Sequence, residues 1–576
     1  MKLIEALRIS QQPSPRGAPA SRIFLACGFT PLHLETYLRA HLRLLCPARD
    51  LRLSTGLYGD LAGNLDRLKN GAVDSCAIAI EWSDLDPRLG LRSLGGWSPA
   101  SLPDIVRTVR ERVDRLNRAI ERLARDTTVA VSLPTLPLPP VAFTPAWRAG
   151  AFEWEVRAAL LGLTRNASSV AMLSPQKVDS MSPMGERSDV ASELHSGFPY
   201  TKEHAAILAE LLARALYPPA PKKGLITDLD DTLWKGIVGE VGSAAVGWDL
   251  NGQAQIHGLY QQCLGSLAEA GVMVAVASKN DPAVVAAALD RSDLAMRRDR
   301  LFPVEVHWKP KSESVARILS AWNVSADAVV FVDDSPLELA EVKQAFPEIT
   351  ALRFPSQDAP AAWRLIEELR DWFGKDALSR EDSLRVASLR QASELGEAAT
   401  RDGQSSDDFL RDLEAVITVD AQKEPPPKRA YELVNKTNQF NMNGARFSWA
   451  EWCALLKDEN AFQWLMSYRD KFGPLGGIAV LVGRRDGGTI QVKTWVMSCR
   501  AFSRHIEHMS LRRLFEQEGV DEVVLDVLTT PRNSPFREFV SSYVPWPEEG
   551  PAHITRAAFE AGCPALHLQV QEAQIA

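Results

Sequence analysis

Three short apolar runs in the middle of the chain each end in polar residues, and helix-like segments separate them. The first run is followed by DLDDT (228–232), the second by Ser278 and the third by Asp333 and Asp334. Strands that alternate with helices form parallel sheets, whose carboxyl ends meet at one edge. We therefore expect an α/β domain with these residues gathered at one sheet edge. The runs are GLIT (224–227), VMVAVA (272–277) and AVVFV (328–332).

Most of the polar groups at these strand ends are carboxylates. Carboxylates that gather at one point repel one another unless a cation lies among them, and an all-oxygen set of ligands suits Mg²⁺. A basic segment, WKPKS (308–312), opens the helix that precedes the third run. A hard cation, a lysine and a hydroxyl group together supply what a phosphoryl group in transfer requires. The sequence thus predicts a magnesium-dependent phosphoryl-transfer site.

The order DxDxT, serine, lysine and Asp-Asp resembles the four motifs of the haloacid dehalogenase (HAD) superfamily. The resemblance implies that Asp228 is the nucleophile that takes the phosphoryl group and that Asp230 is the general acid and base. It implies that one residue braces the loop and two bind phosphoryl oxygens: Thr232, Ser278 and Lys311. Lys309 is the alternative to Lys311. The Mg²⁺ ligands that it implies are Asp228, the Asp230 backbone carbonyl and Asp333, supported by Asp334.

The spacing of these motifs leaves no room for a large inserted cap domain. Between Thr232 and Ser278 lie 45 residues, and between Ser278 and Lys311 lie 32. The expected central domain, residues 221–375, is therefore a capless, Rossmann-like HAD domain with an open site. An open site suits a phosphate that is presented on a macromolecule or on a protein-bound arm.

The residues around the four motifs resemble one particular family of the HAD superfamily. DLDDTLWKGIVGEVG (228–242), VASKND (276–281), HWKPKSES (307–314) and FVDDSP (331–336) are similar to the FkbH-like family, HAD subfamily IIIC. The resemblance implies a glyceryl transferase and phosphatase of polyketide biosynthesis. Such an enzyme takes a glyceryl unit from 1,3-bisphospho-D-glycerate, removes its phosphate, and loads it as a thioester on the phosphopantetheine arm of an acyl carrier protein.

The chain departs from the family pattern at three positions near this site. The family commonly has Asn where Asp231 stands, Gly where Lys235 stands and Asp where Val241 stands. None of them is a residue with an implied catalytic role. Lys235, beside the open site, is the one expected to alter the choice of substrate.

Residues 376–576 are expected to form a polar, helical linker (376–420) and then a domain that resembles the α+β GNAT acyltransferase fold. The family resemblance returns there in LVNKTNQFNMN (433–443) and WVMSCR (495–500). GNAT proteins bind a pyrophosphate with R-x-x-G-x-G at a helix N-terminus. In RAFSRH (500–505), Ser503 and His505 fill both glycine places, which argues against ordinary acetyl-CoA binding.

Cys499 precedes this basic stretch, after an expected strand over 491–497. Arg500, Arg504 and His505 would favour its reactive thiolate, and His505 is a candidate base. A cysteine that carries an acyl group would suit transfer to a carrier thiol, and the other interpretation is a buried core cysteine. Weaker candidates for lining this site are Glu507, Asn435 and Asn438.

The N-terminal part, residues 1–220, alternates strand-like and helix-like segments and resembles an SGNH-hydrolase-like domain. That family's first strand ends in Gly-Asp-Ser, whereas this one ends Cys27-Gly28-Phe29-Thr30, so Thr30 replaces the serine. SELH (192–195) lacks the aspartate of the expected DxxH but keeps His195. We expect a degenerate hydrolase used for docking. The sharper alternative is a Cys27–His195 or Thr30–His195 dyad.

Charge and cysteine usage exclude several functions. A formal net charge of −8 argues against a general nucleic-acid binder. The seven cysteines are scattered without a CxxC pair, which fits a reducing cytoplasm. No apolar run has the length of a secretion signal or a membrane span. The alternatives to the glyceryl transferase are a plain phosphatase and a carrier-protein docking scaffold.

Overall fold

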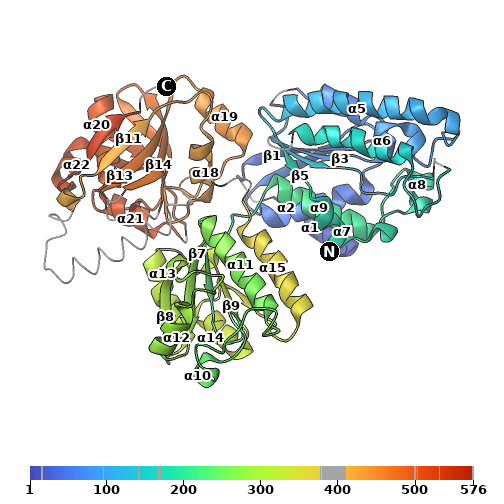
Figure 1. Cartoon of the computed structure of the whole chain (residues 1–576). Coiled ribbons are helices and arrows are strands. Elements are labelled where there is room, and N and C mark those ends of the chain that lie inside the picture. Colours follow the sequence, from blue (N-terminus) through green and yellow to red (C-terminus); the bar gives the residue numbers. More distant parts are fainter. Residues whose placement is uncertain are drawn as a thin grey trace. The chain divides into compact units, whose positions relative to one another are not determined.

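The computed structural model contains three β-sheets, and each is formed by a separate stretch of the chain (Figure 1). Their residues form two compact units, Met1–Pro219 with Phe447–Leu455, and Ala220–Arg446 with Leu456–Ala576. The structure describes residues 1–14, 17–69, 71–94, 96–140, 143–166, 170–375, 378, 410–471, 473–498, 501–502, 504–530 and 532–573.

The first sheet is entirely parallel, in the order β2-β1-β3-β4-β5. Its strands are β1 (Ala20–Ala26), β2 (Asp50–Thr55), β3 (Ser75–Ala79), β4 (Thr128–Ser132) and β5 (Ala171–Met172). An apolar core lies on each face of this sheet. The helices around it are α1 (Leu3–Ser10), α2 (Leu32–Leu45), α3 (Leu61–Arg67), α4 (Trp82–Leu85), α5 (Leu102–Leu123), α6 (Ala151–Leu160), α7 (Pro175–Met181), α8 (Val190–Ser196) and α9 (Lys202–Leu216).

Helix α5 shows how the sequence pattern places one of these elements. Apolar residues recur along it at steps of three and four, the period of one helix face. The structure buries that face and leaves the charged residues between them outside. The parallel α/β architecture that the alternation predicts is confirmed. The buried residues of the predicted stripe are Ile105, Val109, Val113, Leu116, Ile120 and Leu123.

The central sheet is also parallel, in the order β10-β9-β6-β7-β8. Its strands are β6 (Gly224–Thr227), β7 (Met273–Ser278), β8 (Leu301–Val306), β9 (Val329–Asp333) and β10 (Thr350–Arg353). Between β6 and β8 the chain forms β7, one short 3-10 helix (Arg298–Arg300) and the helices α10 (Val238–Val241), α11 (Gln255–Glu269) and α12 (Pro282–Leu289). No cap domain is inserted in this fully described stretch. The remaining helices are α13 (Lys311–Trp322), α14 (Pro336–Ala345) and α15 (Ala359–Phe373).

The third sheet is mixed and follows the order β17-β16-β15-β14-β13-β11-β18, with β12 paired to β15. The predicted hairpin is confirmed, since β14 and β15 are antiparallel around Gly487 and Gly488. The strands are β11 (Val416–Asp420), β12 (Phe440–Asn441), β13 (Ala461–Asp470), β14 (Gly473–Asp486), β15 (Thr489–Met497), β16 (Glu522–Leu525), β17 (Ala552–Thr555) and β18 (Gln569–Glu572). The helices are α18 (Lys428–Lys436), α19 (Trp449–Lys457), α20 (Ile506–Glu518), α21 (Ser534–Ser541) and α22 (Arg556–Gly562).

The predicted helical linker needs one correction. Most of 376–420 lies outside the described residues, but its last five residues form β11. Ile417 and Val419 are buried there and alternate with half-buried neighbours, the period of a strand. Four of the five residues are β-branched, which favours a strand over a helix. Among the described helices, none combines the length and apolar composition needed to cross a bilayer.

Candidate active site

The central sheet brings three of the predicted motifs to one edge. β6 lies between β9 and β7, and the three strands are parallel, so their carboxyl ends are neighbours. β6 leads into Asp228, β7 ends at Ser278 and β9 ends at Asp333. Lys311, the first residue of α13, joins them from the segment after β8.

Lys311 lies between two buried carboxylates. Its Nζ atom is 2.9 Å from Oδ1 of Asp228 and 2.5 Å from Oδ2 of Asp333, and none of the three side chains is more than 7% exposed. Burial acts to lower the pKa of the Lys311 ammonium, but the two carboxylates outweigh it and raise that pKa above its ordinary value. Lys311 is therefore a fixed positive charge beside Asp228.

Asp334 completes a cluster of three carboxyl groups. One oxygen each of Asp228, Asp333 and Asp334 lies within 4.8 Å of the others. Burial raises the pKa of Asp228 to about 6, while Lys311 opposes the rise and Asp333 adds to it. Burial also raises the pKa of Asp333 and that of Asp334. One lysine cannot balance three carboxylates, so this all-oxygen set fits a hard divalent cation.

The Asp230 carboxylate receives three N–H donors. Its Oδ1 accepts hydrogen bonds from the indole nitrogen of Trp234 (2.9 Å) and the backbone nitrogen of Val238 (3.0 Å). Its Oδ2 accepts one from Nδ2 of Asn280 (2.9 Å). The same Nδ2 atom donates to Oγ of Ser278 (3.1 Å). One amide group thus links Asp230 to Ser278.

Thr232 is fully buried beneath this cluster. Its Oγ1 accepts a hydrogen bond from the backbone nitrogen of Asp334 (3.1 Å). Its carbonyl oxygen accepts one from Nδ1 of the buried His257 (2.9 Å). Thr232 therefore holds the loop after β6 against the loop after β9, the bracing position that the HAD resemblance implies.

The structure separates the two candidate lysines. Lys309 is 67% exposed and its Nζ lies 3.7 Å from Glu313, on the outer side of α13. Lys311 instead points into the carboxylate cluster. Both oxygens of Glu341 accept hydrogen bonds from the backbone nitrogens of Lys311 and Ser312, which fixes the start of α13. Lys311 is thus held in place by its backbone as well as by its ammonium group.

The three departures from the FkbH-like pattern lie in the segment between β6 and α11, which includes Asp230. Asp231 has a left-handed backbone (φ 49°), and its Oδ1 accepts a hydrogen bond from the backbone nitrogen of Gly236. The Lys235 ammonium donates to the carbonyl of Gly252, and Val241 is about half exposed. Asparagine would meet the backbone and hydrogen-bond requirements at position 231 equally well.

Sequence reasoning missed Asn280, Trp234 and Glu341. Asn280 follows Ser278 by two residues and Trp234 follows Asp230 by four, so both were visible in the motifs without an evident role. Glu341 lies on α14, remote in sequence from Lys311, and no local pattern marks it as a cap for α13. Asn280 and Glu341 take their roles from contacts between segments that are separate in sequence, whereas Trp234 contacts Asp230 within one loop.

The proposed acyl-transfer site in the last domain is described only in part. Cys499, Arg500 and Ser503 lie outside the described residues. His505 precedes α20 with a left-handed backbone (φ 58°), and its Nδ1 lies 3.4 Å from the carbonyl oxygen of Ala565.

The weaker candidates in that domain lie on two helices or just after one of them. Glu507, in the first turn of α20, is partly buried, and burial raises the pKa of its carboxyl. Asn435 lies in α18, and Asn438 follows that helix and accepts a hydrogen bond from Arg446. The described contacts of Asn438 and Glu507 assign neither a part in acyl transfer.

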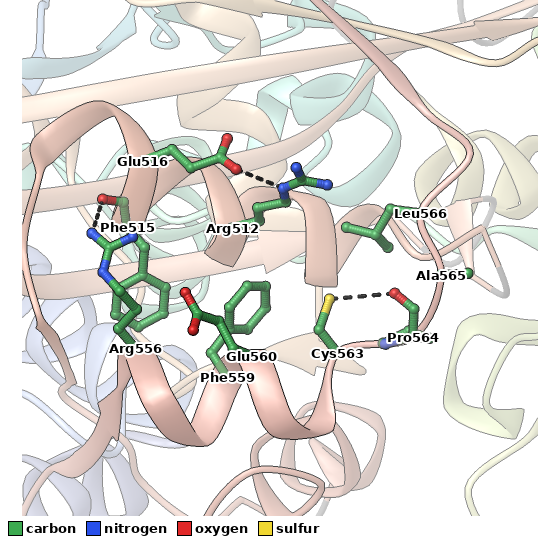
Figure 2. A pocket seen from close by; sticks show the side chains of 10 residues that line it. All are labelled: Arg512, Phe515, Glu516, Arg556, Phe559, Glu560, Cys563, Pro564, Ala565 and Leu566. Atoms are coloured by element: carbon green, nitrogen blue, oxygen red, sulfur yellow. Dashed lines mark hydrogen bonds and ion pairs between the residues drawn. The ribbon is translucent and has the colours of Figure 1, made fainter.

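A cavity of about 380 Å³ lies beside α20 and α22 (Figure 2). The Cys563 thiol faces it and donates a hydrogen bond to the carbonyl of Pro564 (3.4 Å). Burial raises the pKa of this thiol, although the Arg512 guanidinium acts to lower it. Cys563 is therefore a further thiol in the domain that holds Cys499, and the sequence pattern does not single it out.

The N-terminal candidates do not form a catalytic dyad with Cys27. The Cys27 thiol is buried, donates to the carbonyl of Phe29 (3.3 Å), and has a pKa raised far above its ordinary value by burial. His195 is exposed on α8. Thr30 lies near that helix, but its hydroxyl donates to the carbonyl of Ser196 (2.7 Å). The Cys27–His195 alternative is therefore wrong, because the thiol is buried and already bonded to backbone.

The fold is similar to that of a crystallised protein fragment. This is the N-terminal part of BF1531 from Bacteroides fragilis, which contains a phosphatase domain complexed with Mg. The two are 17% identical with a TM-score of 0.53, and the match covers 66% of this chain and 100% of the fragment. Residues 221–375 are only about a quarter of the chain, so the shared fold extends beyond the central domain.

The other comparisons give no further information about the fold or the function. An uncharacterized protein from Corynebacterium glutamicum ATCC 13032 is 18% identical, and the match covers 27% of this chain and 98% of that protein. Its TM-score of 0.19 is too low to support an argument. No family model and no curated protein matches the sequence. The resemblances to the SGNH and GNAT folds stay predictions.

Proposed function

We propose that the central domain is a Mg²⁺-dependent phosphatase of the HAD type. The observation that carries the proposal is the position of Lys311 between Asp228 and Asp333, with Asp334 close enough to complete a cation site. The phosphatase domain of BF1531, crystallised with Mg, belongs to a protein of similar fold. That likeness supports the same class of reaction here.

Asp228 acts as the nucleophile. One of its oxygens bonds to the phosphorus of the substrate while the bond to the leaving oxygen breaks, and Asp230 gives that oxygen a proton. Asp230 then takes a proton from water, whose oxygen attacks the aspartyl phosphate. Inorganic phosphate leaves and the Asp228 carboxylate is restored. Lys311 and the Ser278 hydroxyl stabilise charge on the phosphoryl oxygens throughout.

The residues that would hold Mg²⁺ are Asp228, Asp333 and Asp334, joined by the Asp230 backbone carbonyl as the HAD resemblance implies. When bound, Mg²⁺ neutralises the carboxylates and the charge on the phosphoryl group. Ser335 supports the ligand set, because its backbone nitrogen donates to the second oxygen of Asp333 (2.9 Å). That bond holds the Asp333 carboxylate in one orientation.

The substrate follows from the FkbH-like strings. In this proposal the enzyme takes a glyceryl unit from 1,3-bisphospho-D-glycerate, and the HAD site removes the phosphate that remains on it. The uncapped edge of the central sheet gives access to a substrate held on a protein or on a phosphopantetheine arm. The acyl carrier protein that receives the glyceryl thioester would then be the partner, in a cytoplasmic polyketide pathway.

The C-terminal domain would perform the acyl transfer. The Cys499 thiolate attacks the acyl phosphate carbonyl, a carbon–sulfur bond forms, and phosphate leaves. His505 accepts the thiol proton, and Arg500 binds the anionic end of the substrate. The carrier thiol then displaces Cys499 and takes the acyl group. The N-terminal domain, a degenerate hydrolase in this scheme, would serve docking.

The test is a loading reaction followed by intact-mass measurement. The full chain, Mg²⁺, 1,3-bisphospho-D-glycerate and a phosphopantetheinylated carrier protein are incubated, and the masses of both proteins are recorded. A glyceryl adduct on the carrier supports the proposal. With Asp228→Asn, a phosphoglyceryl adduct should accumulate instead.

The second candidate is a plain phosphatase that acts on a small or carrier-bound phosphoester. The observation that favours it is the filling of both glycine places of the GNAT motif, by Ser503 and His505. Phosphate release from simple esters, without an adduct on either protein, would favour the plain phosphatase. A docking scaffold, the third hypothesis, predicts that Asp228→Asn leaves the function of the protein unaltered.

A further inference from the structure

Asn280 is a buried amide just beyond the end of β7, and it is 3% exposed. Its Nδ2 atom lies 2.9 Å from Oδ2 of Asp230 and 3.1 Å from Oγ of Ser278. An amide NH₂ group has two hydrogens and does not accept. The nitrogen is therefore the donor in both contacts, with one hydrogen available for each oxygen.

The direction of these bonds orients the Ser278 hydroxyl. Because its oxygen accepts a hydrogen bond from Asn280, its own hydrogen must point away from that amide. The hydroxyl can then donate to an oxygen of a phosphoryl group at Asp228. Asn280 thus prepares Ser278 as a donor before a substrate arrives.

The same amide restrains Asp230 from one side. The opposite oxygen of Asp230 accepts from the Trp234 indole and the Val238 backbone, which belong to its own loop. Donors on both oxygens limit the rotation of the carboxyl group. Asn280 lies in the segment that follows the neighbouring strand β7, so it fixes the loop after β6 relative to the end of β7.

We propose that Asn280 is the positioning residue that sets Asp230 and Ser278 in one geometry for catalysis. The proton donor for the leaving oxygen and the donor to the phosphoryl oxygens then act on the same substrate pose. The inference rests on the proposed phosphatase function and extends it, since neither the HAD motifs nor the cation site requires an amide here.

The role predicts a specific dependence on the leaving group. Loss of the Ser278 contact weakens phosphoryl transfer from every ester. Loss of the Asp230 contact matters only when the leaving oxygen needs a proton, as an alkoxide does and the stabilised 4-nitrophenolate does not. Asn280→Ala should therefore lower kcat/KM for glycerol 3-phosphate about tenfold more than for 4-nitrophenyl phosphate.

The experiment compares four forms of the full chain with Mg²⁺: wild type, Asn280→Ala, Asp230→Asn and the double variant. If Asn280 acts through Asp230, adding Asn280→Ala to the Asp230→Asn variant should change kcat/KM for both esters by the same factor. Asn280→Ser keeps one hydroxyl donor. It should recover part of the alkyl-to-aryl ratio, which is kcat/KM for glycerol 3-phosphate divided by kcat/KM for 4-nitrophenyl phosphate. It also serves as the test protein if Asn280→Ala does not fold.

Two results would overturn the proposal. One is an equal loss for both esters in the single variant, which a merely structural role would give. The other is a further tenfold change in the alkyl-to-aryl ratio when Asn280 is removed from the Asp230→Asn background. If the wild-type protein hydrolyses neither ester, the proposed phosphatase function itself fails and the inference falls with it, a result distinct from either of the others.

Discussion

The ammonium nitrogen of Lys311 lies 2.9 Å from a carboxylate oxygen of Asp228, and both side chains are nearly inaccessible to solvent. A buried pair of this kind costs desolvation that only mutual attraction and further hydrogen bonds offset. Removal of one partner leaves the other charge buried and uncompensated. Here the loss of Lys311 would leave Asp228 and Asp333 facing each other with no cation from the protein between them.

Lys311→Ala should therefore abolish phosphatase activity, with kcat/KM reduced at least about a hundredfold, because an electrostatic stabiliser of the phosphoryl group is lost. The matched control is Lys309→Ala, which removes an exposed lysine two residues away on the same segment and should change kcat/KM less than about twofold. Steady-state rates with 4-nitrophenyl phosphate measure both. Equal losses in the two variants would contradict the assignment of Lys311.

Two acids of the same loop, Asp228 and Asp231, give an equally close comparison. Asp228→Asn removes the proposed nucleophile and should lower phosphate release by about a thousandfold or more. Asp231→Asn is the same chemical change three residues on, and it retains the acceptor oxygen that binds the Gly236 backbone and the left-handed backbone that asparagine tolerates. It should keep activity within about twofold of wild type. An inactive Asp231→Asn with an active Asp228→Asn would reverse the roles of the two residues.

Magnesium should stabilise the folded protein. A ligand that binds only the native state increases the free energy of unfolding by RT ln(1 + [L]/Kd), which is about 3 kcal/mol when the ligand concentration is a hundred times Kd. The unfolding temperature measured by calorimetry should therefore rise when Mg²⁺ is added and fall when a chelator removes it. Asp333→Asn removes one carboxylate of the cluster and should make that rise smaller. An undiminished rise in this variant would place the cation elsewhere.

The sequence was most informative where local pattern and topology agree. A strand that ends in DLDDT and a second that ends in Asp-Asp specify the site once the sheet is parallel, because β6, β7 and β9 are adjacent. The roles of Asn280 and Glu341 could not be read in the same way. Their contacts depend on which loops and helices pack side by side at the sheet edge, and a single sequence does not encode that adjacency in any local period.

Errors arose where the pattern was weak. Residues 416–420 were expected to be helical with the preceding stretch, yet they pair with β13 and β18 as a strand. The polar residues upstream masked a short β-branched segment whose alternation is only five residues long. The position of Cys27 at the end of the first strand suggests a nucleophile, and only the three-dimensional packing shows its thiol to be buried.

Substitution of two of the three cysteines of residues 376–576 distinguishes acyl transfer from simple phosphatase activity. Cys499→Ala should abolish the glyceryl adduct on the carrier protein and leave phosphate release from 4-nitrophenyl phosphate unchanged, because the proposed acyl acceptor is not part of the HAD site. Cys563→Ala, in the same domain beside the cavity, is the control and should keep loading within about twofold. Intact masses measure both. Loading that survives Cys499→Ala but not Cys563→Ala would move the acyl group to Cys563.

The N-terminal domain contains a buried carboxyl group that makes its stability depend on pH. Glu81 is 3% exposed, and its Oε1 accepts hydrogen bonds from the backbone and hydroxyl of Thr135 and from the Tyr200 hydroxyl. Burial raises the pKa of Glu81 from 4.5 to about 7, although these hydrogen bonds oppose the rise. The folded protein therefore binds the proton more tightly than the unfolded chain does.

The sign of the effect follows from that difference. The stability that the protonated carboxyl contributes is present in full below about pH 4.5 and is lost as the pH rises towards 7, a change on the order of 3 kcal/mol. Glu81→Gln cannot titrate and keeps one acceptor oxygen, so it should flatten this dependence. Calorimetry of the full chain at pH 5, 6, 7 and 8 measures this pH dependence. The unfolding transition to follow is the one whose temperature changes in Glu81→Gln. Parallel pH profiles for the variant and the wild type would mean that Glu81 is ionised when folded, with its hydrogen bonds outweighing the cost of burial.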